Sequence, residues 1–478
     1  MSDASEMNLG WESVKGIAGK FGQAATGFVG ILIFTRIVGK SDFGGFYLLL
    51  SLVMIADRPI RGLGQAVAKR WSEDGAPKRE ILGTVLVVNV CASLVAGVGA
   101  FLARDILVSY TSLEGSPLLF AALFGSIAFF FPFQQMMGAE GWPAKQTWND
   151  TLRSFLTLPL QLVLVVSGLG ALGMGYGLVA ATLLVVPVAI YFVRVHPSLP
   201  SRETVRSLWD YARYSTPAAI VGKAYDRIDV LLLGFLVGTT SVANYEVALR
   251  LTVPALFVSG VLSSALMPKI SNTISKGGEF VDDITNSVSY VSILAVPIFF
   301  GALAIPRPLV VTAFEPQYAD AAPYLIGLAL YQLISTQTVI YSQTLSGMDL
   351  PDIQFKIRAI TLTFNVIIGV TLALTVGPLG IVIATVLAES LKYGLSVRQV
   401  LNQVDGVEVI PKPLILQIIS GTMMFLIVNF LQARLTIQSW VTLGFTVGVG
   451  AIVYAACLFA ISPQVRFTAQ AVVRDAVT

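Results

Sequence analysis

Residues 37–52 of the chain read IVGKSDFGGFYLLLSL, and residues 236–251 read LVGTTSVANYEVALRL. The two stretches align at an offset of 199 residues, and each one joins two long apolar segments. A tryptophan precedes each block, Trp11 in one case and Trp209 in the other. This internal repeat predicts two related helical bundles, a plan that many transporters share. Chance similarity between apolar helices is the alternative.

The composition points to a membrane protein. Of the 478 residues, 55% are hydrophobic and only 12% are charged, and the mean hydropathy is +0.77. Soluble domains carry about 25% charged residues, so a soluble protein of this composition would lack the polar side chains to cover its surface. The same figures exclude a disordered chain, a collagen and a secreted disulfide scaffold. The sequence therefore predicts an all-α polytopic membrane protein.

The apolar segments can be counted against the thickness of a bilayer. A helix that crosses the hydrocarbon needs about 20 mostly apolar residues. This length predicts fourteen transmembrane helices, with short connections and no soluble catalytic domain between them. They are expected near residues 15–38, 43–66, 81–103, 117–138, 147–167, 171–193, 209–236, 242–266, 284–305, 321–345, 359–377, 379–400, 412–432 and 437–461.

The basic residues of the loops predict the orientation. With the N-terminus inside, sixteen Lys and Arg lie in inner loops and the tail, and four lie in outer loops. Because basic residues favour cytoplasmic loops, both termini are expected in the cytoplasm. We predict two six-helix lobes, a cytoplasmic linker and a C-terminal segment of two further helices with a tail. Their ranges are 1–193 and 209–400 for the lobes, 194–208 for the linker and 401–478 for the C-terminal segment.

Eleven basic side chains fall inside the predicted spans, where an isolated charge is expensive. Some lie near span ends and can reach the head groups, but others lie deeper, including Arg153 in the fifth span. The embedded bases outnumber the embedded acids, and this excess requires water or an anionic ligand. Phosphate is the natural candidate, because guanidinium binds it bidentately and ammonium binds it as a point charge.

The spacing also permits local ion pairs, which are the structural alternative to a ligand site. Asp57–Arg61 and Glu246–Arg250 are i,i+4 pairs, and Lys223–Asp226 and Glu389–Lys392 are i,i+3 pairs. Such pairing alone could account for about half of the embedded charges.

The sequence contains no pattern typical of an enzyme. It has no nucleophile with a matching base, no phosphate-binding Walker loop and no cluster of metal ligands. The stretch GLGALG at 168–173 matches a dinucleotide fingerprint but joins two apolar spans, so we interpret it as a tight turn. We expect no catalytic residue, no metal and no cofactor.

The repeat, the fourteen spans and the stretch YARYSTPAAIVGKAYDRIDVLLLGFLVG (211–238) resemble one branch of a transporter superfamily. This is the polysaccharide-exporter branch of the multidrug/oligosaccharidyl-lipid/polysaccharide superfamily, the flippases of lipid-linked oligosaccharides. The sharpest local element runs from Asp229 to Gly234 and is followed by Tyr245. The chain is similar to haloarchaeal members implicated in N-glycosylation of surface-layer (S-layer) glycoproteins.

The resemblance implies a protein of the cell membrane that translocates a polyprenyl- or dolichyl-(pyro)phosphate-linked sugar by alternating access. In this hypothesis the embedded bases contact the phosphate or line its path; they are Lys20, Arg58, Arg61, Lys223, Arg227 and Arg250. Four acids pair with them or bind a coupling cation; they are Asp57, Asp226, Asp229 and Glu246.

The expected partners are the lipid-linked sugar, membrane lipids and glycosyltransferases or an oligosaccharyltransferase of the same pathway, without nucleic acid. Two alternative functions stay open. A cation-coupled multidrug or ion antiporter should have an acid-rich cavity, and a non-transporting scaffold for glycan-assembly enzymes needs no embedded charges.

Overall fold

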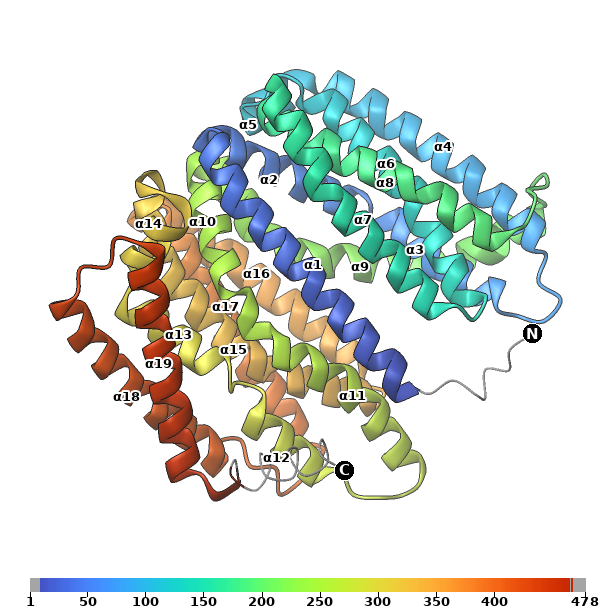
Figure 1. Ribbon diagram of the computed structural model, residues 1–478. Coiled ribbons are helices and arrows are strands. Elements are labelled where there is room, and N and C mark those ends of the chain that lie inside the picture. The colour runs from blue at the N-terminus through green and yellow to red at the C-terminus, as the bar shows by residue number, and fades with distance from the viewer. Residues whose placement is uncertain (1–8, 465, 467–478) are drawn as a thin grey trace. The chain divides into compact units, whose positions relative to one another are not determined.

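The computed structural model describes residues 9–464 and 466, and the side chains in this range except those of residues 9–21, 24, 214, 215 and 218. All regular elements in these residues are helices, as the sequence predicted. The chain forms two compact units, residues 1–243 and 244–478. The colour bar of Figure 1 allows the reader to follow the chain through each of them.

The first unit contains nine helices in its described part and the start of a tenth. They are α1 (Leu9–Ile37), α2 (Lys40–Ala56), α3 (Arg58–Trp71), α4 (Lys78–Leu102), α5 (Arg104–Thr111), α6 (Ser116–Ala139), α7 (Pro143–Leu164), α8 (Gly170–Val193), α9 (Arg202–Leu236) and α10 (Thr239–Thr252). A π-helical turn at Val165–Leu169 separates α7 from α8.

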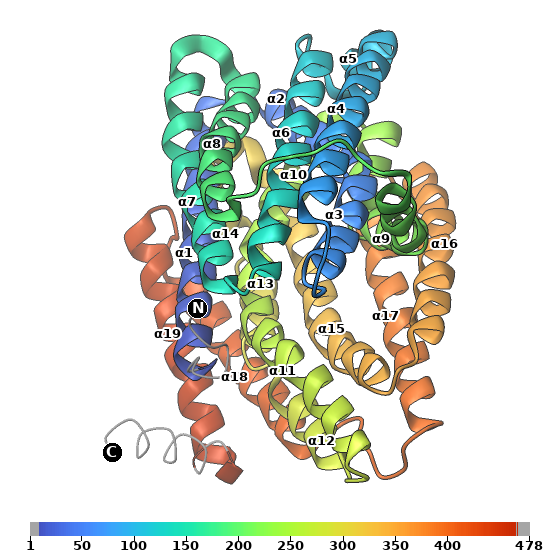
Figure 2. The same cartoon turned by 90° about the vertical axis from the view of Figure 1, so that its right-hand side faces the viewer.

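Helices α4, α6, α7 and α8 run side by side in this unit (Figures 1 and 2). Glycines permit the closest approaches: a Cβ at Gly175 of α8 would overlap Leu119 of α6, and one at Gly177 would overlap the backbone of Gln161. At one end of the bundle the buried Trp71 donates its indole N–H to Glu140 Oε1 over 2.7 Å. Lys78 Nζ lies 2.7 Å from the same oxygen, so one carboxylate joins α3, α4 and α6.

The connector between α8 and α9 is docked on the first unit. Ser198 N donates to the carbonyl of Arg79 over 3.0 Å, and Gly83 of α4 leaves room for the carbonyl of Ser198. Helix α9 then begins with Ser201 as its N-cap, while Thr204 Oγ1 donates to Glu80 Oε2 over 2.7 Å. These contacts fix where α9 starts.

The short helix α5 supports the other end of α9. Tyr110 donates its hydroxyl to the carbonyl of Leu231 over 2.7 Å. Burial raises the pKa of Tyr110 to about 12, so the hydroxyl keeps the proton that it donates. Beside it, Gly45 of α2 leaves room for the carbonyl of Thr111. Helices α2, α5 and α9 are therefore held together at this end of the unit.

The second unit contains the rest of α10 and the following helices. They are α11 (Leu256–Ser275), α12 (Val281–Tyr290), α13 (Ala295–Ala304), α14 (Pro306–Phe314), α15 (Ala322–Gly347), α16 (Pro351–Val376), α17 (Leu379–Leu401), α18 (Lys412–Arg434) and α19 (Trp440–Ile461). Helices α15, α16 and α17 lie side by side, and α18 packs with α13 and α19.

A break between α12 and α13 interrupts one apolar segment of this unit. Gln337 of α15 donates to the carbonyl of Val288 over 3.2 Å and to Ser292 Oγ over 2.7 Å. Gln417 of α18 donates to the carbonyl of Ser289 over 2.6 Å. A break in a membrane helix frees backbone carbonyls that must find donors inside the protein. The two buried glutamines supply these donors and tie α15 and α18 to the break.

Ten segments of the described chain are long and apolar enough to cross a membrane, or eleven if the bent pair α2–α3 counts as one. The membrane protein that the sequence predicted is thus confirmed, while the count of fourteen spans and the cytoplasmic termini stay predictions. One of the ten segments, Pro143–Val193, contains both α7 and α8. Helix α9 is not among them, since four charged residues lie between Lys223 and Asp229.

The compact units divide between Ala243 and Asn244, beyond the predicted linker at 194–208. The reason lies in α9, which packs on α2 and α3 of the first unit. Only residues 194–201 of the predicted linker are free of helix. The proposed lobes at 1–193 and 209–400 stay a prediction about the transport cycle.

Candidate functional site

The centre of the candidate site is the bend between α2 and α3. The two helices are bent by 44° at Asp57, which is the C-cap residue of α2 and the N-cap residue of α3. Pro59 follows in the first turn of α3. Because proline has no N–H, the helix cannot continue its hydrogen bonding through this position, and a bend results. Pro59 is the sequence signal for this break.

Asp57 is almost fully buried, with 1% of its side chain exposed, and it binds both neighbouring arginines. Arg58 Nη2 lies 2.8 Å from Asp57 Oδ1, and Arg61 Nε lies 2.9 Å from Asp57 Oδ2. Arg58 Nε also donates to the carbonyl of Met54 over 2.8 Å. A buried carboxylate thus holds two guanidinium groups in place across the bend. Its contact with Arg61 confirms the predicted i,i+4 pair.

The two arginines keep part of their surface accessible. The side chain of Arg58 is 16% exposed and that of Arg61 is 30% exposed. The Arg61 guanidinium lies 4.6 Å from the ring centroid of Phe131 on α6. Stacking on a ring leaves the full positive charge and does not use the N–H donors. An anion can therefore still be bound by these groups.

Charges of α9 lie close to this arginine pair. Gly62 of α3 leaves room for the hydroxyl of Thr216, so α3 and α9 approach closely at this level. Asp226 attracts Arg58 electrostatically, and Arg58 and Arg227 both repel Lys223. The charges predicted on two separate spans are thus brought together in the first unit.

Within α9, Lys223 Nζ lies 3.5 Å from Asp226 Oδ2, as the i,i+3 spacing predicted. The lysine is 20% exposed and the aspartate 59% exposed, so this pair is held less firmly than the pair at Asp57. Asp229 is buried. Together, residues 57–61 and 223–229 contain four bases and three acids, which leaves the group with a net positive charge.

The other predicted site residues belong to the second unit or lie outside the described side chains. Glu246 is fully buried and lies 3.5 Å from Arg250 Nη2, which confirms the predicted pair, but both residues belong to the second unit. The pair Glu389–Lys392, at 3.2 Å, lies there as well. The side chain of Lys20 lies outside the described residues. That all six bases contact the phosphate or line its path stays a prediction.

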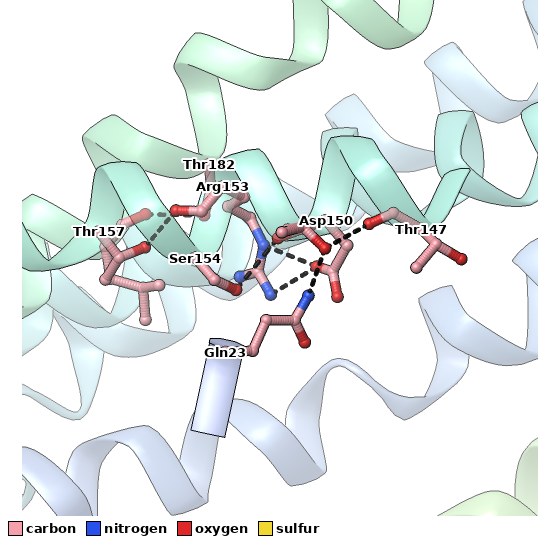
Figure 3. A network of polar contacts seen from close by, with 9 residues as sticks. Gln23, Thr147, Asp150, Arg153, Ser154, Thr157 and Thr182 are labelled. Atoms are coloured by element: carbon pink, nitrogen blue, oxygen red, sulfur yellow. Dashed lines mark hydrogen bonds and ion pairs between the residues drawn. The ribbon is translucent and has the colours of Figure 1, made fainter. Parts of the chain in front are cut away.

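A second arginine site in the first unit was not among the predicted site residues. Arg153 of α7 lies 2.9 Å from Asp150 Oδ1, and its guanidinium lies 5.0 Å from the ring centroid of Phe130. Figure 3 shows Gln23 of α1 pointing toward this group, and its Nε2 donates to Thr151 Oγ1 over 3.1 Å. The sequence signal for this site is the position of Arg153 inside the predicted span 147–167, where a charged side chain needs a partner.

Phe130 and Phe131 are neighbours on α6, and each ring packs against one guanidinium group, that of Arg153 on Phe130 and that of Arg61 on Phe131. Helix α6 therefore supports two guanidinium groups on adjacent rings. In the described part of the chain, no group of three or more His, Cys, Asp or Glu could hold a metal ion. The chemistry that this arrangement supports is the binding of anions by fixed cations.

Comparisons with known proteins agree with this reading of the fold. Residues 33–323 match the family model described as polysaccharide biosynthesis protein. A probable low-salt glycan biosynthesis flippase of Haloferax volcanii is 29% identical over 80% of this chain and 81% of its own length. A probable flippase of the same organism, AglR, is 27% identical over 78% of this chain and 79% of its own length.

Among solved structures, the lipid II flippase MurJ in an inward closed conformation has the same fold. Its TM-score is 0.75 at 14% identity, and the match covers 94% of this chain and 98% of that one. The family model spans more than half of the sequence. The chain therefore belongs to the polysaccharide biosynthesis protein family, in the polysaccharide-exporter branch of the multidrug/oligosaccharidyl-lipid/polysaccharide superfamily.

Proposed function

We propose that this protein is a flippase that moves a polyprenyl- or dolichyl-(pyro)phosphate-linked sugar from the cytoplasmic to the outer leaflet. The single observation that carries the proposal is the group of cations at the α2–α3 bend and on α9, anchored by the buried Asp57. Family membership and the names of the two relatives support it. The sugar would serve the assembly of cell-surface glycans or glycoproteins, including those of an S-layer.

The cations act on the step that limits unassisted flipping. A phosphate head group cannot enter hydrocarbon without losing its hydration, which costs many kcal/mol for an isolated charge. Arg58, Arg61 and Lys223 replace that hydration with fixed positive charges and N–H donors. Asp57 keeps the guanidinium groups oriented before the substrate arrives. The sugar remains in water and the polyprenyl tail remains in lipid.

The wider site belongs to the same proposal. Lys20, Arg227 and Arg250 extend the path of the phosphate, and Asp226, Asp229 and Glu246 balance these charges or bind a coupling cation. Fourteen spans with both termini in the cytoplasm form lobes at 1–193 and 209–400, joined by 194–208 and followed by two helices in 401–478. Movement of the lobes exposes the site to each side in turn.

Two other functions are distinguished by charge and by activity. A cation-coupled multidrug or ion antiporter would present acids to its cargo, whereas bases prevail at this site. A scaffold for glycosyltransferases or an oligosaccharyltransferase would move no lipid-linked sugar at all. Both of those enzymes remain candidate partners of the flippase.

The test is a transport assay in proteoliposomes with a labelled dolichyl-phosphate-linked sugar. The triple variant Arg58→Gln, Arg61→Gln, Lys223→Gln is compared with wild type and with Arg104→Gln. Arg104 is a suitable control, because it is exposed and its ion-pair partner in the described part of the chain is its exposed neighbour Asp105. We expect the triple variant to lose transport while the control keeps it. Full transport by a correctly inserted triple variant would refute the proposal.

A further inference from the structure

A cluster of cations and aromatic rings lies at one end of the α7–α8 pair. The cluster consists of Trp142, Lys145, Tyr191, Phe192 and Arg194. Lys145 Nζ lies 4.0 Å from the ring centroid of Trp142 and 4.7 Å from that of Phe192. One ammonium group is thus in contact with two rings.

The rings form a continuous surface that carries a second cation. Trp142 and Phe192 meet edge to face with their ring centroids 6.0 Å apart, and the centroids of Tyr191 and Phe192 are 5.5 Å apart in the same arrangement. Arg194 lies 5.0 Å above the ring of Tyr191, and its Nη2 is 3.3 Å from the tyrosine hydroxyl. Lys145, Tyr191 and Arg194 are all exposed, so the surface is accessible.

The charges of this cluster are not balanced by acids. Within the described residues, neither Lys145 nor Arg194 forms an ion pair with a carboxylate. Their neighbours in the same unit differ in this respect, since Lys78 pairs with Glu140 and Arg70 pairs with Glu73. A ring attracts a cation without neutralising it. The two positive charges therefore remain available to an external anion.

The position of the cluster identifies that anion. Pro143–Val193 is one of the segments that can span a membrane, and the cluster residues occupy both of its ends. The ends of a spanning segment lie at the level of the lipid head groups, where tryptophan and tyrosine are enriched. The anions that are abundant at this level are lipid phosphates, and an anionic lipid surface attracts basic side chains.

We propose that Trp142, Lys145, Tyr191, Phe192 and Arg194 form a binding site for the phosphate of an anionic membrane lipid. Arg194 offers several N–H donors to the phosphate oxygens, and Lys145 adds a point charge. The rings pack against the glycerol and upper acyl region of the same lipid. This lipid is a resident partner of the first unit and is distinct from the transported substrate, so the inference does not depend on the proposed function.

The experiment compares bilayer nanodiscs of phosphatidylcholine with nanodiscs that also contain phosphatidylglycerol. Retention of phosphatidylglycerol is measured by native mass spectrometry, and the thermal midpoint is measured in both lipids. The test variant is Lys145→Gln with Arg194→Gln. The control is Arg434→Gln, which removes a cation 5.5 Å above the ring of Phe430 at the end of α18.

We expect wild type and the control to retain phosphatidylglycerol and to gain thermal stability from it. The double variant should bind this lipid about 30-fold more weakly, which corresponds to about 2 kcal/mol at 1.4 kcal/mol per factor of ten. In phosphatidylcholine alone, its thermal midpoint should equal that of wild type, which shows that the fold is intact. Equal lipid retention in all three proteins, or an equal loss in the control, would overturn the proposal.

Discussion

Ser41 Oγ and Thr239 Oγ1 lie 2.8 Å apart, and they join the first turns of α2 and α10. These two helices begin at corresponding positions of the sequence repeat, directly after Gly39 and Gly238. Gly44, on the next turn of α2, has room for the carbonyl of Thr239 only because it lacks a Cβ. The two copies of the repeated motif are therefore in direct contact at their helix starts.

The first prediction concerns this contact. Gly44→Ala should lower the free energy of unfolding by about 1–3 kcal/mol, because the new Cβ meets backbone atoms that cannot rotate away. The measurement is the thermal midpoint in detergent. Gly99→Ala is the control, since a Cβ there meets nothing within 4 Å; it should be neutral or stabilising. Equal effects of both variants would contradict the contact.

The second prediction concerns the carboxylate at the α2–α3 bend. Asp57→Asn should destabilise the protein by about 2 kcal/mol, because two partly buried guanidinium groups lose their counter-charge. Adding Arg61→Gln should recover part of this loss, since one unpaired charge is then removed. Denaturation of the single and double variants measures the coupling. Strictly additive effects would show that Asp57 does not hold Arg61.

The third prediction separates the charge of Arg61 from its shape. Arg61→Lys keeps the charge but loses the planar group that lies on Phe131 and binds phosphate bidentately. Transport of the lipid-linked sugar should fall about fivefold, which corresponds to about 1 kcal/mol. Lys69→Arg, where the lysine lies over Tyr211, is the matched exchange elsewhere in the unit and should leave transport unchanged. Wild-type rates for Arg61→Lys would show that charge alone suffices.

The fourth prediction concerns the break between α12 and α13. Gln417→Leu removes the donor to the carbonyl of Ser289 and should lower the free energy of unfolding by about 1–2 kcal/mol. Thr422→Val, on the same helix, is the control, because it removes only a local bond to Ile418. Hydrogen exchange at residues 288–294 should rise in the first variant alone. Unchanged exchange would show that the break needs no support from α18.

The sequence predicted well the features that depend on composition and on local spacing. The all-helical membrane fold and the pairs Asp57–Arg61, Lys223–Asp226 and Glu246–Arg250 follow from hydropathy and helix geometry, and the structure confirms them. Whether the paired bases bind phosphate is a separate question that stays a prediction.

Features that depend on packing between distant helices could not be read from the sequence. The stacking of Arg61 on Phe131 and the shared oxygen of Glu140 join residues about 60 to 70 positions apart. No periodicity links such residues, since each contact is set by how neighbouring helices approach. The bend at Asp57 is different, because Pro59 is a local sequence signal for it. Hydropathy, however, averages over the break and predicts one continuous span at 43–66.

Residues 194–201, which connect α8 to α9, are held against α4 by hydrogen bonds at Ser198 and at Thr204. Ser198 is bonded to the backbone of Arg79, and Thr204 is bonded to Glu80, so the crossover cannot stretch without breaking one of these bonds. If α9 shifts along its axis, the first turn of α4 must therefore move with it. Lengthening the crossover with glycine and serine after His196 would separate the two movements, and it would reveal whether the flippase needs them joined.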